Sequence, residues 1–198
     1  MSLDPNIEER SRYVIGIDLG TTNSAVAYVD TAQRQWQVRD FAVPQLVAPH
    51  QVEARETLPS FHYEAAAGEV SGRALGLPWT APTAEPRSAV GVWARDHGAA
   101  VPSRLVVSAK SWLSHSGVDR TADLLPWHAA PDVSKLSPVE ASARYLGHIR
   151  AAWDHAHPEH PLAQQDVILT VPASFDEVAR ELTVEAAKRG GFGRLVLL

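Results

Sequence analysis

The stretch Tyr13-Val14-Ile15-Gly16-Ile17-Asp18-Leu19-Gly20-Thr21-Thr22-Asn23-Ser24-Ala25-Val26-Ala27 decides the fold of this chain. Two apolar runs flank a polar turn, a pattern that predicts two strands joined tightly with an acidic residue at the edge of the turn. Such a turn aims backbone N–H groups and hydroxyls at one point, where they form a nest for an anion. Because Asp18 would repel a bare phosphate, the pattern favours a hydrated cation between them, and so a loop that binds phosphate and magnesium. The alternative is an ordinary hairpin with a Gly-Thr-Thr-Asn turn.

The composition is that of an ordinary globular protein. Of the 198 residues, 45% are hydrophobic and 21% are charged, and the net charge is −5. This acidic balance, without a basic stripe, argues against a nucleic-acid partner. The absence of cysteine excludes disulfides and thiolate metal sites. No apolar stretch reaches the length of a membrane span and the polar start is unlike a signal peptide, so we expect a cytoplasmic protein with no membrane partner.

The last third of the chain carries the clearest signals for helices and strands. Ser137, followed by a proline and by Glu140, predicts a capped helix that runs to about residue 155. The apolar run 167–171 predicts a buried strand that ends at Pro172. A second capping box predicts the next helix, and the final apolar residues predict a strand. The residues behind these last two predictions are Ser174 and Glu177 for the cap, Phe175, Val178, Leu182 and Ala186 for one helix face, Gly190-Gly191 for the helix end and 194–198 for the strand.

The middle of the chain gives weaker signals. We expect short extended segments at 36–41 and 58–63, an irregular surface insertion over 64–89 and a short helix within 90–99. A further apolar stretch leads into a helical turn that carries Lys110. Together these elements predict an α/β fold, a mixed sheet flanked by helices. A chain that finishes on a strand is unusual, and we expect the sequence to be truncated.

Four collinear segments resemble the heat shock protein 70 (DnaK-type) chaperones, which belong to the actin-like ATPase superfamily. They are IGIDLGTTNSAVA at 15–27, SAKSWL at 108–113, LSPVE at 136–140 and the run 167–191 that contains VPASF and AAKRGG. The first segment alone would also suit a sugar kinase of that superfamily. The resemblance implies the N-terminal lobe of the nucleotide-binding domain, with the ribonuclease H-like fold of its superfamily.

The family implies roles for the matching residues. Asp18 would hold Mg²⁺ through water, and Gly20, Thr21, Thr22 and Asn23 would cradle the β- and γ-phosphates of ATP. Lys110 would face the γ-phosphate and help to position the attacking water; without the resemblance it reads as a solvated helix lysine. The catalytic set implied is therefore Lys110, Asp18 and Thr21.

Two further matches concern communication with a substrate domain. Pro172 and Arg180 stand where the family couples its nucleotide state to peptide binding. From the residues alone, Pro172 reads as a strand terminator and Arg180 as an exposed helix residue. Compared with familiar members, residues 59–110 form a longer stretch and residues 110–138 a shorter one, which marks a divergent member.

The resemblance implies an organisation and a function. We expect a disordered tail or cloning remnant at 1–12, a core subdomain at 13–62 and 137–198, and an upper subdomain at 63–136. The whole protein would be a chaperone that hydrolyses ATP to ADP and acts on unfolded polypeptides, with co-chaperones as further partners. The alternatives are a sugar or carboxylate kinase and a nucleotide-binding regulatory module. The chain by itself is expected to bind ATP weakly and not to hydrolyse it.

Other polar groups suggest less. His155, His157 and His160 lie close together in sequence, but they lack an acidic or cysteine partner at convincing spacing, which favours a helix-end loop over a metal site. Asp119-Arg120 reads as solvated surface.

Overall fold

The computed structural model describes residues 11–198. Its main sheet has six strands. Five follow the order β11-β10-β1-β2-β3, and the sixth, β6, pairs with the first residues of β2. The strands are β1 (Tyr13–Asp18), β2 (Asn23–Asp30), β3 (Arg39–Asp40), β6 (Thr57–Pro59), β10 (Asp166–Thr170) and β11 (Arg194–Leu197). β1 runs antiparallel to β2 but parallel to β10, which is in turn parallel to β11. The predicted mixed α/β sheet is therefore confirmed.

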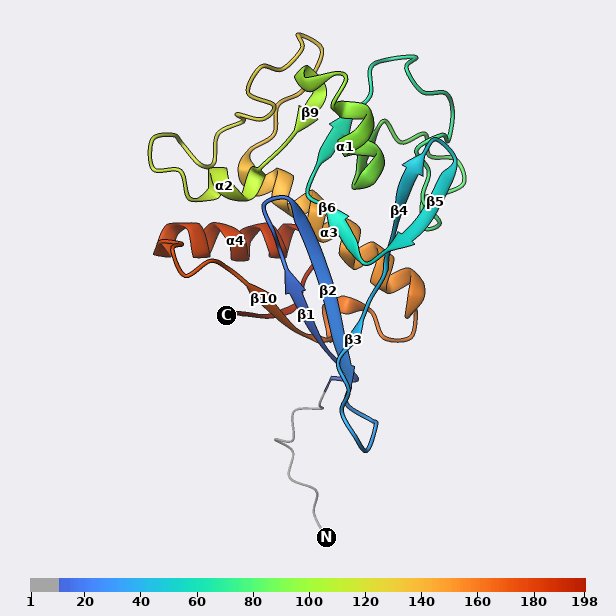
Figure 1. Cartoon of the computed structure of the whole chain (residues 1–198), viewed down its shortest axis with the longest axis vertical. Helices are drawn as coiled ribbons and strands as arrows, with labels where there is room; N and C mark the ends of the chain where they lie inside the picture. Colours follow the sequence, from blue (N-terminus) through green and yellow to red (C-terminus); the bar gives the residue numbers. More distant parts are fainter. Residues whose placement is uncertain (1–10) are drawn as a thin grey trace.

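Two long helices complete the core (Figure 1). α3 (Pro138–Ala156) and α4 (Glu177–Arg189) pack against each other and against the sheet. The alternation of buried residues along β1 and β10 places Ile15, Ile17, Val167 and Leu169 on the covered face. Ser137 caps α3 by accepting a hydrogen bond from the Glu140 amide at 3.1 Å, as its spacing predicts.

The remaining elements are short. They are β4 (Val43–Ala48), β5 (Gln51–Arg55), β7 (His62–Glu64), β8 (Ser88–Val90), β9 (Leu105–Val106), α1 (Val92–Gly98), α2 (Ala109–Leu113) and the 3-10 turns η1 (Pro102–Arg104) and η2 (Leu162–Gln164). β4 and β5 form a hairpin, and β7 lies between β8 and β9 in a three-stranded sheet. A second apolar cluster joins them; it contains Leu46, Tyr63, Ala65, Leu75, Ala89, Trp93, Ala94 and Leu105.

Several predicted boundaries need correction. Of the strand expected at 36–41, only Arg39–Asp40 pairs with β2, because Trp36 and Val38 are 62% and 75% exposed and have no core to pack on. The extended segment at 58–63 is two strands, β6 and β7, which enter different sheets on either side of Ser60. The β4–β5 hairpin was not predicted. The insertion predicted at 64–89 is irregular only over 65–87, since Glu64 ends β7 and Ser88 begins β8. It is not wholly at the surface, because Ala65 and Leu75 are buried.

The start of α4 also differs from its prediction. Asp176, not Ser174, is the N-cap, and it accepts a hydrogen bond from the Ala179 amide at 2.7 Å. The buried face of the helix also differs from its prediction, since Val178 is 52% exposed while Ala179 and Thr183 are buried. The helix ends as its glycines predict, with Gly191 at a φ of +87°.

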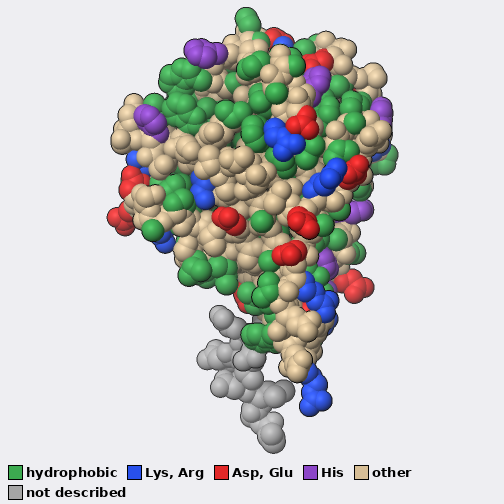
Figure 2. All heavy atoms as spheres, viewed as in Figure 1, with side chains coloured by type: hydrophobic (Ala, Val, Ile, Leu, Met, Phe, Trp, Pro, Cys, Tyr) green, Lys and Arg blue, Asp and Glu red, His purple; other side chains and the backbone are tan. Residues whose placement is uncertain are grey.

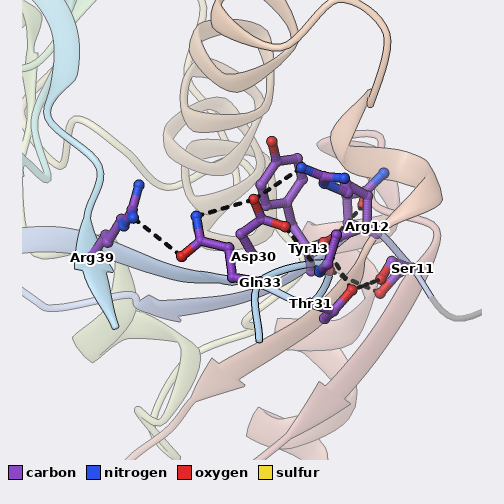
Figure 3. Close-up of polar contacts among 9 residues, drawn as sticks. Ser11, Arg12, Tyr13, Asp30, Thr31, Gln33 and Arg39 are labelled. Carbon is purple, nitrogen blue, oxygen red and sulfur yellow. Dashed lines mark hydrogen bonds and ion pairs between the residues drawn. The ribbon is translucent and has the colours of Figure 1, made fainter. Parts of the chain in front are cut away.

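The end of the sheet nearest the N-terminus is held by a polar network (Figure 3). Ser11 donates from its hydroxyl to Asp166 at 2.7 Å, and Arg12 pairs with Asp30 at 2.9 Å. Most of the tail predicted at 1–12 lies outside the described residues. Its last two residues are bonded to the sheet, so the start of the folded body lies before Tyr13.

Candidate functional site

The turn between β1 and β2 is as tight as its sequence predicts. An ideal Cβ added to Gly20 would lie 1.9 Å from the backbone oxygen of Asn23, so that only glycine fits this position without moving the turn. The side chains of Thr21, Thr22 and Asn23 are exposed. The turn therefore presents two hydroxyls and an amide side chain to solvent at one end of the sheet.

Asp18 lies at the carboxyl end of β1, beside the carboxyl end of β10. The register pairs Asp18 with Thr170, and the Thr170 hydroxyl donates to Asp18 Oδ1 at 2.9 Å. We call this edge of the sheet, where both parallel strands end, the carboxyl edge. Ligands of α/β sheets bind at such edges because the chain leaves the sheet there and exposes its polar groups. Thr170 was not singled out from the sequence.

Lys110 approaches the carboxyl edge from α2. Ser108, which precedes the helix, has a φ of +54°, a left-handed conformation that non-glycine residues adopt with some strain. Lys110 is only 8% exposed, and its Nζ lies 5.8 Å from the centre of the Phe175 ring. Burial lowers the pKa of Lys110, and the charge of Asp18 partly opposes that shift. The charges of Lys110 and Asp18 are therefore close enough to influence each other.

Ser60 supports the turn between β1 and β2 through hydrogen bonds, and we call this support the brace. Ser60 was not singled out from the sequence. Its hydroxyl donates to the Gly20 carbonyl at 2.8 Å and lies 3.1 Å from the Ser24 hydroxyl, while its amide donates to the Thr22 carbonyl at 2.9 Å. Ser60 and Ser24 are 1% and 0% exposed. The brace joins residues far apart in sequence, so only the pairing of β2 with β6 reveals it.

Pro172 and Arg180 lie further along the same edge. Pro172 is exposed just after β10, and its carbonyl accepts from the Phe175 amide at 3.0 Å. Arg180 is half-buried in the first turns of α4. Within residues 11–198, no side-chain hydrogen bond or ion pair joins Arg180 to Asp18 or Lys110. The carboxyl edge thus unites Asp18, the Gly20 turn and Lys110, whereas Arg180 stands apart.

The prediction that Asp119-Arg120 is solvated surface is wrong for Arg120. The Arg120 side chain is 12% exposed and forms a two-pronged ion pair with Asp176, with both N···O distances at 2.8 Å. This pair ties the loop after α2 to the start of α4. Figure 2 shows apolar side chains gathered over that loop, and basic and acidic side chains interspersed over the face shown.

Of the three clustered histidines, His157 packs among aromatic rings. His157 stacks on Trp153, with ring centres 4.0 Å apart, inside an aromatic group that includes Tyr13 and Tyr28. Across residues 11–198, no group of three or more His, Asp or Glu side chains is arranged to hold a metal ion.

The carboxyl edge fits the magnesium and phosphate chemistry that the sequence implies. Asp18 is exposed, and one of its carboxylate oxygens accepts a hydrogen bond from Thr170, while the other has no hydrogen-bond partner among the described residues. A single carboxylate with retained waters is how Mg²⁺ is commonly held beside phosphates. The Gly20 turn, in which a Cβ would meet backbone, lets amides approach an anion closely.

Comparison with known proteins identifies relatives of one kind. Chaperone protein HscA homologs of Bordetella pertussis and of Actinobacillus pleuropneumoniae serotype 5b are 30% and 31% identical to this chain over 204 and 202 residues. Chaperone protein HscA of Salmonella paratyphi C is 31% identical over 197 residues. These matches cover 98%, 94% and 94% of this chain, but only 28%, 27% and 27% of the relatives. The chain thus spans a little over a quarter of the length of these relatives.

No family model matches the chain. None of the helices formed by residues 11–198 combines the length and the hydrophobicity that crossing a bilayer requires. Over nearly all of its own length the chain is similar to chaperones of the heat shock protein 70 (DnaK-type) family, and its mixed α/β sheet is that of the first lobe of an actin-like ATPase.

Proposed function

We propose that this chain forms the phosphate-binding side of an ATP site in a chaperone ATPase. The observation that carries the proposal is the meeting of Asp18, the Gly20 turn and Lys110 at the carboxyl edge. In this proposal the backbone and hydroxyls of Gly20, Thr21, Thr22 and Asn23 hold the β- and γ-phosphates. Neutral donors close to a glycine suit phosphate oxygens because they need no counter-charge.

Asp18 would hold Mg²⁺ through water, with Thr170 fixing the orientation of its carboxylate. When bound, the metal would neutralise phosphate charge, as it does in other nucleotide sites. Thr21 and Asp18 would then set the direction from which the phosphates enter.

Lys110 is the residue proposed to meet the γ-phosphate and the attacking water. Lys110 as a residue is only 8% exposed, and charge placed in a water-poor setting stabilises a transferring phosphoryl group better than an exposed charge does. A lowered pKa leaves the ammonium with a weaker hold on its proton, which suits orientation of water by hydrogen bonding.

We propose the function of the whole protein from the names of its relatives. Those relatives are chaperones, which favours the chaperone over the kinase alternative. Unfolded polypeptides and co-chaperones are the proposed partners, and the cytoplasm is the proposed location. Pro172 and Arg180 are proposed to pass the nucleotide state to the substrate domain, and residues 63–136 to form the upper subdomain.

The chain by itself is proposed to bind ATP weakly and not to hydrolyse it. Asp18 and the turn side chains are exposed, so they would contact the phosphates from one side only. Weak contacts of this kind do not exclude the water that competes with them.

Nuclear magnetic resonance titration with ATP, with and without Mg²⁺, tests the site. Amide signals of Thr21, Thr22 and Asn23 should shift at millimolar ATP, and Asp18→Asn should remove the Mg²⁺-dependent part. Asp40→Asn, an exposed carboxylate of β3, is the control and should change nothing. Shifts confined to another face would refute the site, and a micromolar dissociation constant by calorimetry would refute the weak binding.

A further inference from the structure

The loop over residues 114–136 is joined to the start of α4 by an ion pair. Both Nη atoms of Arg120 donate to Asp176, one to each carboxylate oxygen at 2.8 Å. Two-pronged pairs of this kind fix orientation as well as distance. The Arg120 side chain is 12% exposed and that of Asp176 is 52% exposed, so the pair lies at the surface with its guanidinium largely covered. We call Arg120 and Asp176 the clamp.

Asp176 sets the position of the residue before it. The same carboxylate caps α4 through the Ala179 amide, and Arg120 is the first cause of its pKa lying at about 2. Phe175, the neighbour of this cap, is half-buried and packs against the main core. Its ring is the one that lies 5.8 Å from Lys110 Nζ. The clamp therefore anchors the backbone that carries this ring.

Arg120 also connects the clamp to α2 through His115. Arg120 Nε donates to the His115 carbonyl at 3.3 Å. The His115 ring stacks on Trp112 with centres 5.3 Å apart, and Trp112 stands two residues after Lys110 in α2. A closed ring of contacts thus runs from α2 through Arg120 and Asp176 to Phe175, and back to Lys110.

We propose that Arg120 is a positioning residue, which holds the Phe175 ring over Lys110 and so fixes the ammonium at the carboxyl edge. Lys110 has a flexible four-carbon stem, and without a cover it would sample many rotamers. Holding one of them places the charge before a ligand arrives. The importance of this position rests on the proposed function, in which Lys110 meets the γ-phosphate. The contacts themselves do not depend on it.

Lysine NMR signals report the contact directly, because the lysines of the chain are only Lys110, Lys135 and Lys188. In protein labelled with ¹³C-lysine, the ring current of Phe175 should displace the Cε–Hε signal of Lys110. Phe175→Leu should abolish that displacement and defines the uncovered position. Arg120→Gln is expected to move the Lys110 signal towards it, with the signal of Lys188, which lies in the last turn of α4, unchanged as evidence of an intact fold.

Two conservative variants separate positioning from charge and from capping. Arg120→Lys keeps the charge but loses the fork, and should also move the signal. Asp176→Asn keeps a good N-cap but loses one prong, and should move it part of the way. Arg150→Gln, which breaks an ion pair with Asp154 and a bond to Gly190 at the other end of α4, is the control and should leave Lys110 in place.

The outcomes are distinct from those of the ATP experiment, since no nucleotide is present. If Arg120→Gln leaves the Lys110 signal at the wild-type position, or if Phe175→Leu does not move it, the proposal is overturned. If the clamp variants move it but ATP with Mg²⁺ never perturbs it, the positioning stands and the proposed function fails.

Discussion

Ser60→Ala is the sharpest test of how the candidate phosphate turn is supported. The Ser60 hydroxyl has one hydrogen, which it donates to the Gly20 carbonyl at 2.8 Å. The Ser24 hydroxyl must therefore be the donor of the 3.1 Å bond to Ser60. Truncation removes both bonds and leaves a buried hydroxyl and a backbone carbonyl without these partners.

The size of the effect follows from those two bonds. At about 1 kcal/mol for each, the free energy of unfolding should fall by about 2 kcal/mol. For a chain of this length, roughly 2–4 °C in melting temperature accompany each kcal/mol, so the melting temperature should fall by about 4–8 °C. Thermal and urea unfolding measure the change, and ATP-dependent shifts of the turn should weaken with it.

Ser142→Ala is a matched control within the same core. Ser142 is 0% exposed, like Ser24, but its hydroxyl has no hydrogen-bond partner among the described residues. Its removal should change the unfolding free energy by less than about 0.5 kcal/mol or increase it. If Ser60→Ala and Ser142→Ala proved equally stable, the argument for the brace would be wrong.

Three other predictions follow from the geometry. Gly20→Ala would place a Cβ 1.9 Å from the Asn23 carbonyl oxygen, so unfolding should become easier by about 1–3 kcal/mol, as urea titration would show. In the full-length protein, Lys110→Ala should lower ATP turnover by roughly 10²-fold or more, and unchanged turnover would remove Lys110 from the catalytic set. Burial holds the pKa values of His62 and His148 at about 3 and about 4, below the ordinary 6.5, so the unfolded chain takes up more protons as the pH falls from 6.5 to 4. Stability should decline across that window, and less so in His62→Gln; a flat profile in the wild type would contradict this.

Local signals predicted the parts of the fold that local chemistry determines. The strand–turn–strand at the start, the cap at Ser137 and the strand that ends near Pro172 all follow from neighbours within a few residues. The predicted cap of α4 was wrong because Ser174 and Asp176 are both good caps, and the contact of Asp176 with Arg120, 56 residues away, is not visible in the local sequence.

The candidate site divides in the same way. Asp18, the Gly20 turn and Lys110 were named from motifs, while Ser60 and Thr170 enter only through strand pairing. Ser60 lies 40 residues from Gly20 in sequence, and Thr170 lies 152 residues from Asp18. No periodicity or spacing can reveal such contacts, because they depend on which strands become neighbours. The β4–β5 hairpin was missed for a related reason, since its second strand is mostly exposed and lacks a clear alternation.

The parallel pairing of β1 with β10 has a consequence during synthesis of the protein. The 152 residues between Asp18 and Thr170 take roughly 8–30 s to translate at 5–20 residues per second. For that time the apolar strand Tyr13–Asp18 has an unpaired edge, which is a template for association with other chains. Contacts of such long range also form slowly after release. A chain that resembles chaperones thus has, while it is being made, an aggregation-prone strand of its own.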